Sequence, residues 1–373
     1  MTHELFHHDL KFPLESGGYL PGFQLKYSTA GTLNPDRSNV IWVTHALTGS
    51  SDVLDWWGEL FTPTGAFPLD KFFVIGVNAL GGCYGSTGPL SVNRETGKPF
   101  YHSFPLLTHR DIVNGFDLLR QHLGIKKIHT LIGGSLGGQQ VLEWAIIHPK
   151  VAEHIVPIAC NAQHSAWGIA FNEAQRMAIA ADVTWKEDSA RAGVTGMKAA
   201  RAVAMISYRT YNIYNETQGE NTNDAIDDLR AASYQRYQGD KLANRFNAFT
   251  YWTFSKAMDN HNVGRSRVEK SFPDPSQSNE TSINEAIDKV LKTIQAKTLV
   301  VGIESDVLFP LSEQQYLVEK IPRAQLATIK TDYGHDGFLV EFEQLNNLLR
   351  GFYNARPLTP EGGTSARILS SIF

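Results

Sequence analysis

Short apolar segments that alternate with amphipathic ones most constrain how this chain can fold. Four nearly continuous apolar runs lie in its first 165 residues: VIWVTHAL (40–47), FFVIGVNAL (72–80), IHTLIGG (128–134) and HIVPIACNA (154–162). Strands that are buried on both faces of a parallel sheet have this composition. Between the runs, RDIVNGFDLLRQHLG (110–124) and QQVLEWAIIHP (139–149) place apolar residues at helical spacing. The alternation predicts an α/β fold with a mostly parallel central sheet.

A helical stretch interrupts this alternation in the middle of the chain. Residues 166–294 hold helix-forming segments, among them GMKAARAVAMISYRTYNIY (196–214), and no apolar run of the buried-strand type. Strand patterns return in KTLVVGIES (297–305) and QLATIKTD (325–332), and EFEQLNNLLRGFY (341–353) has the spacing of a last helix.

These patterns predict one large domain with an insertion. The α/β core would comprise residues 1–165 and 295–373, and residues 166–294 would be inserted into it as a helical lid domain. The polar, Pro- and Ser-rich segment 271–282 is predicted to be a loop, and the weakly patterned tail 357–373 is assigned no structure.

Composition and charge exclude several classes of protein. The formal net charge of -4 at pH 7, with no basic stripe, argues against a nucleic-acid partner. No apolar run reaches about 18 residues and the first residues lack a signal-peptide pattern, so we expect no membrane partner and a cytoplasmic location. Cys83, Cys160 and the scattered histidines match no metal-ligand spacing, so neither a disulfide framework, a metal nor a cofactor is expected.

The segment LIGGSLGGQQ (131–140) places one serine among four glycines where a predicted strand becomes a predicted helix. A plain tight turn is one interpretation, because glycine-rich turns are common. A G-x-S-x-G pattern between a strand and a helix is, however, typical of a strained turn that exposes a nucleophilic serine. The N-terminus of the following helix would favour negative charge that develops there. We therefore predict that Ser135 is a catalytic nucleophile.

Ser135 would need a base, because a serine hydroxyl is a weak nucleophile at neutral pH. Where a serine occupies such a turn, an acidic residue and then a histidine follow it along the chain. His335 and Asp306 each lie just after a predicted strand, so we predict His335 as the base and Asp306 as the residue that orients it. Glu304 is an alternative to Asp306. His261 is an alternative to His335 that is less well placed, because it lies in the helical stretch.

Negative charge on a substrate oxygen would be stabilised by two backbone N–H groups that form an oxyanion hole. We predict that Leu136, directly after the serine, supplies one of them. Leu47, in the small-residue loop VTHALTGSSD (43–52) after an earlier strand, would supply the other. His45 precedes the serine in the chain and is predicted to be structural.

Seven separate segments, in order along the chain, resemble those of a known enzyme family. They are VTHALTGS, FFVIGVNALGGCYGSTGP, GGSLGGQQVLEWA, FNEAQRMAI, KAMDNHNVGR, GIESDVLFP and YGHDGFL. Together they resemble the homoserine O-acetyltransferase family, and the resemblance extends over nearly the whole chain. It implies an α/β-hydrolase fold with a helical lid insertion, and an acyltransferase activity in methionine biosynthesis.

The resemblance also implies a reaction in two steps. Ser135 would take an acetyl group from acetyl-CoA, and L-homoserine would then accept it to give O-acetylhomoserine. Arg209 would bind the carboxylate of the amino acid, Asp336 would contact its amine or hydroxyl, and Tyr208 would hydrogen-bond the substrate or pack in the lid. Arg176 would line the tunnel to the site or pair with a nearby carboxylate. The inserted helices would cover the site and form a homodimer interface.

The sequence leaves the acyl group, the acceptor and the reaction class open. Succinyl-CoA in place of acetyl-CoA, or L-serine in place of L-homoserine, would require only a few substitutions in the pocket. A serine esterase would use the same three residues on the same scaffold. A non-catalytic binding module is disfavoured, because the nucleophile, the acid and the base are all present.

Overall fold

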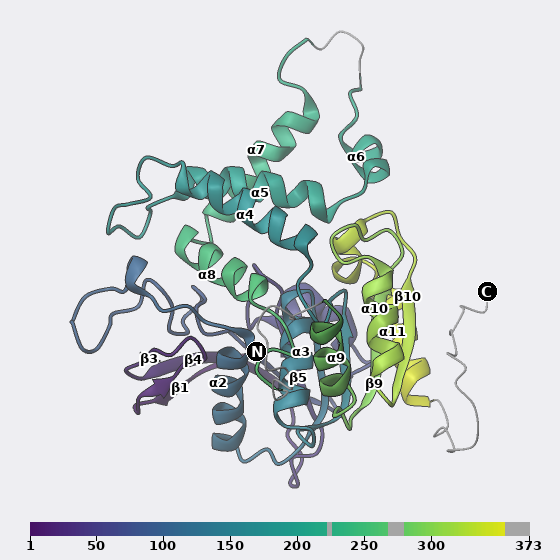
Figure 1. Cartoon of the computed structure of the whole chain (residues 1–373). Helices are drawn as coiled ribbons and strands as arrows, with labels where there is room; N and C mark the ends of the chain where they lie inside the picture. The colour runs from purple at the N-terminus through teal and green to yellow at the C-terminus, as the bar shows by residue number, and fades with distance from the viewer. Residues whose placement is uncertain (222–225, 268–279, 355–373) are drawn as a thin grey trace.

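A central sheet of eight strands organises the described part of the chain, residues 1–221, 226–267 and 280–354 of a computed structural model (Figure 1). The strand order is β1-β4-β6-β5-β7-β8-β9-β10. In chain order these strands are β1 (Thr2–His8), β4 (Phe23–Gly31), β5 (Val40–Thr44), β6 (Phe73–Val77), β7 (Ile128–Gly134), β8 (Ala152–Ile158), β9 (Lys297–Ile303) and β10 (Ala324–Ile329). A separate hairpin pairs β2 (Phe12–Pro13) with β3 (Tyr19–Leu20).

The six strands from β5 to β10 run parallel, whereas β4 pairs antiparallel with both β1 and β6. The parallel strands are buried on both faces, as β5 shows. All five of its residues are buried, with Trp42 in one core cluster and Ile41 and Val43 in another. The predicted α/β fold with a mostly parallel sheet is confirmed.

Helices cover both faces of this sheet. The core cluster that contains Trp42 packs under α2 (His109–His122), α3 (Leu136–Ile147), α9 (Glu280–Leu291) and α10 (Leu311–Lys320). The cluster that contains Ile41 packs under α1 (Val53–Trp57), the 3-10 helix η1 (Gly58–Phe61) and α11 (Phe342–Asn354). Two further 3-10 turns are η2 (Tyr101–Ser103) and η4 (Gly334–Leu339).

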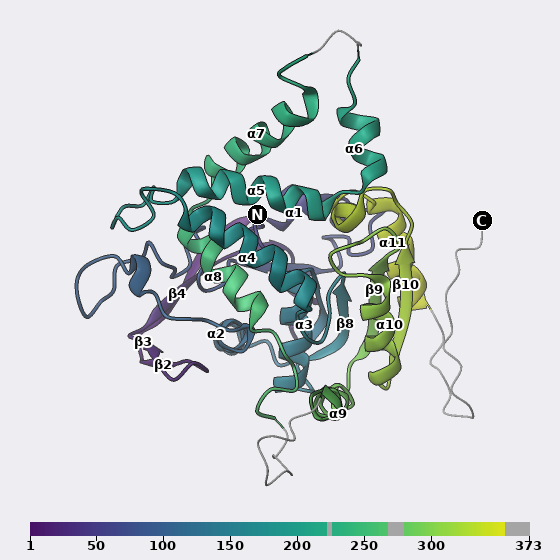
Figure 2. The ribbon, with the colours of Figure 1, turned by 45° about the horizontal axis from the view of Figure 1, so that its top comes forward.

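Five helices form a separate layer above the sheet, which we call the lid (Figures 1 and 2). They are α4 (Ala166–Ala180), α5 (Val194–Tyr208), α6 (Tyr211–Gln218), α7 (Arg230–Ala243) and α8 (Ala248–Asp259). α5 packs against α4 and α7, α4 packs against α8, and α5 also contacts the turn η4 that follows β10. The lid therefore reaches the core at one of the loops where site residues are predicted.

α9 falls within the predicted inserted segment 166–294 but packs with the core. Its Asp288 accepts hydrogen bonds from Tyr316 Oη (2.7 Å) and Lys320 Nζ (2.8 Å), both on α10. The predicted domain boundaries stay a prediction. Because α9 packs with the core, the layer above the sheet consists of α4–α8 alone.

The helix-forming segment 196–214 forms two helices rather than one, because the chain breaks between α5 and α6. Arg209 has extended backbone angles, with φ -119° and ψ 152°. The Thr210 side chain then accepts a hydrogen bond from the backbone N–H of Ile213 and starts a new helix. The periodicity of apolar residues continues across this break, so it does not reveal it. Because of this break, the backbone at Arg209 leaves the helical path of α5.

Two predictions fall largely outside the described residues. The tail 357–373 lies entirely outside them. The predicted loop 271–282 lies outside as far as residue 279, and its last three residues already belong to α9.

Candidate active site

Ser135 occupies the sharp turn between β7 and α3. Its backbone angles are φ 58° and ψ -124°, a conformation that costs a non-glycine residue about 1–3 kcal/mol. The turn lies directly against the end of β5. A Cβ added at Gly133 would lie 2.1 Å from Thr44 Oγ1, and one at Gly137 would lie 2.3 Å from the Thr44 carbonyl oxygen. Glycine is therefore required at both positions by packing, and the tight turn holds Ser135 at the carboxyl end of the sheet.

His335 and Asp306 form a hydrogen-bonded pair on loops at the ends of neighbouring strands. His335 lies in η4 after β10, and Asp306 lies just after β9. The distance from His335 Nδ1 to Asp306 Oδ2 is 2.6 Å, and Nδ1 is the donor because a carboxylate only accepts. The other carboxylate oxygen accepts from the backbone N–H groups of Leu308 (2.8 Å) and Phe309 (2.9 Å). These bonds fix the imidazole with its second nitrogen, Nε2, directed away from Asp306.

Aromatic rings enclose the His335 imidazole. Phe309 stacks on it with ring centroids 5.2 Å apart, and the rings of Phe338 and Tyr208 lie 5.6 Å away. Phe338 also packs against the turn that holds Ser135, since a Cβ added at Gly134 would lie 2.4 Å from its ring. The loop of His335 and the turn of Ser135 are thus in direct contact. Sequence reasoning missed both phenylalanines, whose only signal was their closeness in the chain to Asp306 and His335.

Opposing effects set the pKa of His335. Burial disfavours the charged imidazolium and lowers the pKa. The charge of Asp306 and its hydrogen bond raise the pKa, and Asp336 adds to this effect. The attraction outweighs the burial, so the pKa of His335 lies above its ordinary value of 6.5.

The raised pKa of His335 predicts how the reactivity of Ser135 changes with pH. A base accepts a proton only when it is neutral, so the fraction of competent enzyme falls as the pH drops through the raised pKa. We expect the rate at which a serine-directed covalent probe labels Ser135 to rise with pH, with a midpoint above 6.5. A midpoint at or below 6.5 would contradict this assignment of the base.

The alternatives to Asp306 and His335 lie elsewhere. Glu304 is half-exposed and faces Lys330 Nζ at 3.7 Å. His261 is buried, and its Nε2 donates to the carbonyl oxygen of Asn161 at 2.9 Å. Burial also lowers the pKa of His261 well below its ordinary value, which makes it a poor proton acceptor.

The two predicted oxyanion-hole residues lie at the ends of strands β5 and β7. Leu136 is the first residue of α3, and Leu47 is buried in the loop after β5. In the described part of the chain, neither backbone N–H donates a hydrogen bond to another residue. His45 fixes the Leu47 loop, because its Nε2 accepts from the Ala79 N–H (3.1 Å) while its Nδ1 donates to the Ala46 carbonyl (2.8 Å).

The residues expected to bind an amino acid lie beside His335. Arg209 Nε donates to Asp336 Oδ2 at 2.8 Å, and both side chains are mostly buried. Tyr208 contacts the same loop, since a Cβ added at Gly334 would lie 2.8 Å from the Tyr208 carbonyl oxygen. The structure therefore brings Tyr208, Arg209 and Asp336 together at the base.

Arg176 makes internal ion pairs in the lid. Its side chain is 1% exposed, and its Nη2 lies 2.5 Å from both Glu173 Oε2 and Asp259 Oδ2. A further hydrogen bond joins its Nη1 to Ser255 Oγ at 3.1 Å. Of the two roles that the sequence left open for Arg176, these contacts favour pairing with carboxylates.

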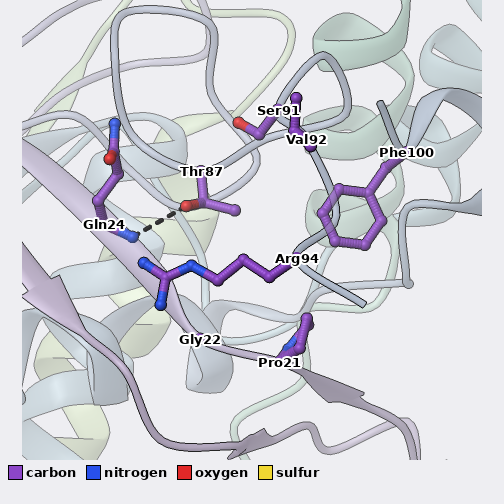
Figure 3. Close-up of a pocket in the computed structure, with 8 residues that line it drawn as sticks. All are labelled: Pro21, Gly22, Gln24, Thr87, Ser91, Val92, Arg94 and Phe100. Carbon is purple, nitrogen blue, oxygen red and sulfur yellow. Dashed lines mark hydrogen bonds between the residues drawn. The ribbon is translucent and has the colours of Figure 1, made fainter. Parts of the chain in front are cut away.

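Two surface pockets lie outside the candidate site. One, of about 300 Å³, lies at the start of β4, and Figure 3 shows Arg94 extending across it while the backbone N–H of Gln24 donates to Thr87 Oγ1. Arg94 is already paired with Asp9 at 2.5 Å. The other, of about 390 Å³, is lined mainly by aromatic side chains between α8 and the segment 101–106. Neither pocket contains a predicted site residue.

Known proteins share this fold and sequence. Residues 39–342 match the family described as the alpha/beta hydrolase fold. A protein named homoserine O-acetyltransferase from Cyclobacterium marinum is 45% identical over 353 residues, which cover 95% of this chain and 95% of that protein. The chain belongs to the homoserine O-acetyltransferase family. The resemblance predicted from the seven sequence segments is confirmed.

Solved structures agree with membership of the homoserine O-acetyltransferase family. The structure of homoserine O-acetyltransferase from Staphylococcus aureus matches with a TM-score of 0.76 at 27% identity, covering 96% of this chain and 97% of that chain. The structure of a protein named esterase E22 matches with a TM-score of 0.80 at 25% identity, covering 94% and 99%. The protein is an enzyme, an acyltransferase on an alpha/beta-hydrolase scaffold.

Within residues 1–221, 226–267 and 280–354, no cluster of three or more His, Cys, Asp or Glu side chains is placed to bind a metal ion. No helix in this same part of the chain is both long enough and apolar enough to span a membrane.

Proposed function

We propose that this enzyme transfers an acetyl group from acetyl-CoA to the side-chain hydroxyl of L-homoserine, through an acetyl-Ser135 intermediate. One observation carries the proposal. A histidine oriented by Asp306 lies beside the strained turn of Ser135 and, in the same place, beside the Arg209–Asp336 pair. The oriented His335 beside Ser135 suits acyl transfer. The Arg209–Asp336 pair offers the positive and the negative charge that a zwitterionic amino acid needs.

The first step would acylate the enzyme. Ser135 Oγ attacks the thioester carbon while His335 Nε2 takes the hydroxyl proton. The C–S bond then breaks, and CoA leaves as a thiol with that proton. The N–H groups of Leu47 and Leu136 would stabilise the oxygen that becomes negative, and Asp306 would stabilise the imidazolium.

The second step would pass the acetyl group to the acceptor. The homoserine hydroxyl gives its proton to His335 and attacks the acetyl carbon, so that the bond from this carbon to Ser135 Oγ breaks. The proton returns to Ser135, and O-acetylhomoserine leaves. The lid would keep water from the ester, since hydrolysis competes with transfer.

The reaction of acetyl-CoA with and without homoserine tests this proposal. We expect a burst of CoA equal to the enzyme concentration without homoserine, and continued CoA release only when homoserine is added. CoA release that homoserine does not affect would instead indicate a hydrolase, the activity named for esterase E22. Comparing kcat/KM for acetyl-CoA and succinyl-CoA, each with homoserine and with L-serine, decides between donors and acceptors.

Removing the Arg209 guanidinium should weaken use of the amino acid. Arg209→Ala is expected to raise KM for homoserine by about 10- to 100-fold, the usual effect of losing a hydrogen bond to a charged group. The burst of CoA from acetyl-CoA alone should stay close to that of the unmodified enzyme. An equal loss in this first step would argue against a role in binding the acceptor.

We also propose the wider setting that the family resemblance implies. O-acetylhomoserine would enter methionine biosynthesis in the cytoplasm, with acetyl-CoA as co-substrate and no further cofactor. The chain would form a homodimer through the lid, on which Met177, Ile206 and Tyr211 expose large apolar surfaces. Sedimentation velocity measures this oligomeric state directly.

A further inference from the structure

Arg201 is a lid residue that pairs with no carboxylate among the residues that the structure describes. It lies on α5, two turns before Tyr208, and is half-buried. Its Nε is buried without a hydrogen-bond partner, and no carboxylate among the described residues pairs with its guanidinium. Burying a charge without a counter-charge is costly. The same lid neutralises Arg176 with two carboxylates, whereas no described carboxylate neutralises Arg201, so its half-buried guanidinium is available to an anionic ligand.

The Tyr208 ring contacts both the guanidinium of Arg201 and the imidazole of the base. The Cζ of Arg201 is 5.5 Å from the centroid of the Tyr208 ring, and the centroid of this ring is 5.6 Å from that of the His335 ring. A second polar group nearby is also unsatisfied: the hydroxyl of Tyr214 on α6 is buried without a hydrogen-bond partner among the described residues. Burial raises the pKa of Tyr214 to about 12, and the charges of Arg209 and Arg201 oppose this rise.

Charge balance distinguishes the two arginines near the base. Arg209 already donates its Nε to Asp336, so that pair is neutral as a unit. A zwitterionic amino acid brings one carboxylate and one ammonium group. If Asp336 is shared between Arg209 and the ammonium group, the carboxylate needs a further cation, and Arg201, beside Tyr208, has no carboxylate partner in the described part of the chain.

We propose that Arg201 is a specificity-determining residue that binds the carboxylate of the amino-acid acceptor, with Tyr214 donating its hydroxyl to the same group. The inference rests on the proposed function and adds to it a second guanidinium for the acceptor. A guanidinium suits this task, because its planar N–H groups can donate two parallel hydrogen bonds to one carboxylate. The carboxylate, in turn, would supply the counter-charge that Arg201 lacks.

The test compares two acceptors that differ only in the carboxylate, L-homoserine and 3-aminopropan-1-ol. Arg201→Gln removes the charge, and Arg201→Lys keeps the charge but not the planar group. Lys198→Gln is the matched control, because Lys198 lies on the same helix and pairs with Asp240 at 2.7 Å. We expect Arg201→Gln to raise KM for homoserine by about 10- to 100-fold, with Arg201→Lys intermediate. For 3-aminopropan-1-ol, kcat/KM should change less than twofold.

The burst of CoA from acetyl-CoA alone separates failure of this inference from failure of the proposed function. If the unmodified enzyme forms no acetyl-Ser135, the proposed function is wrong. If it does, and Arg201→Gln keeps a normal burst and an unchanged KM for homoserine, only the role of Arg201 is overturned. An equal loss for both acceptors, or a loss of the burst in both Arg201 variants, also overturns it, because a carboxylate site would affect neither the shorter acceptor nor acylation.

Discussion

Ser135→Ala is expected to abolish the acetyl-enzyme and to lower kcat by a factor on the order of 10⁶, the loss measured when a serine protease loses its nucleophile. Without Oγ no ester bond to the protein can form. The fold should survive, because alanine is smaller and the turn is fixed by the packing of Gly133 and Gly137 against β5. Mass spectrometry of quenched reactions measures the acetyl adduct, and thermal unfolding checks the fold.

Cys83→Ala serves as the control for this experiment, since Cys83 carries a thiol beside the segment that joins two lid helices, α7 and α8. Its Sγ lies 3.9 Å from the Arg245 carbonyl oxygen. Burial raises the pKa of the Cys83 thiol to about 11, so the reactive thiolate is scarce at neutral pH. The Cys83 variant should therefore turn over normally. Near-normal turnover of Ser135→Ala, together with loss of activity in Cys83→Ala, would reverse the assignment.

Asp306→Asn is expected to lower kcat by up to about 10⁴-fold, as in serine proteases. An amide side chain can donate to Nδ1 of His335 and so stabilise the tautomer that carries its proton on Nε2, where the base must accept one. The variant also removes the charge that raises the pKa of His335. The midpoint of the pH profile for labelling Ser135 should therefore move to lower pH.

Glu304→Gln is the matched control, because Glu304 lies two residues from Asp306 but faces Lys330 at the surface. Its turnover and pH profile should equal those of the unmodified enzyme. The opposite result, a slow Glu304 variant and an unaffected Asp306 variant, would assign the orienting role to Glu304.

The parallel part of the sheet could be predicted because its strands are buried on both faces. β5 has no exposed residue, so its sequence is a continuous apolar run. β1 could not be found in this way, because only Phe6 of its seven residues is buried and the rest of the strand is polar or exposed. An edge strand of this kind depends on pairing with β4, which no local pattern records.

The candidate site was predictable to the extent that chain order and turn chemistry determine it. Ser135, Asp306 and His335 each follow a strand, so parallel topology alone brings them to one edge of the sheet. The pairing of Arg209 with Asp336 was not predictable, because the two residues are 127 positions apart and meet only through the break after α5. That Arg201 has no carboxylate partner among the described residues was not predictable either, since this is a property of the packed lid.

The insertion of the lid between β8 and β9 has a consequence for synthesis on the ribosome. β9 begins at Lys297, 139 positions after β8 ends at Ile158. At ordinary elongation rates these residues take on the order of ten seconds to synthesise. During that time β8 is an open strand edge that can pair with other chains. During this interval the nascent polypeptide carries the serine without its acid or base, so it cannot consume cellular thioesters. Once β9 and β10 have formed, the open edge of β8 is paired, and the same step brings Asp306 and His335 to Ser135.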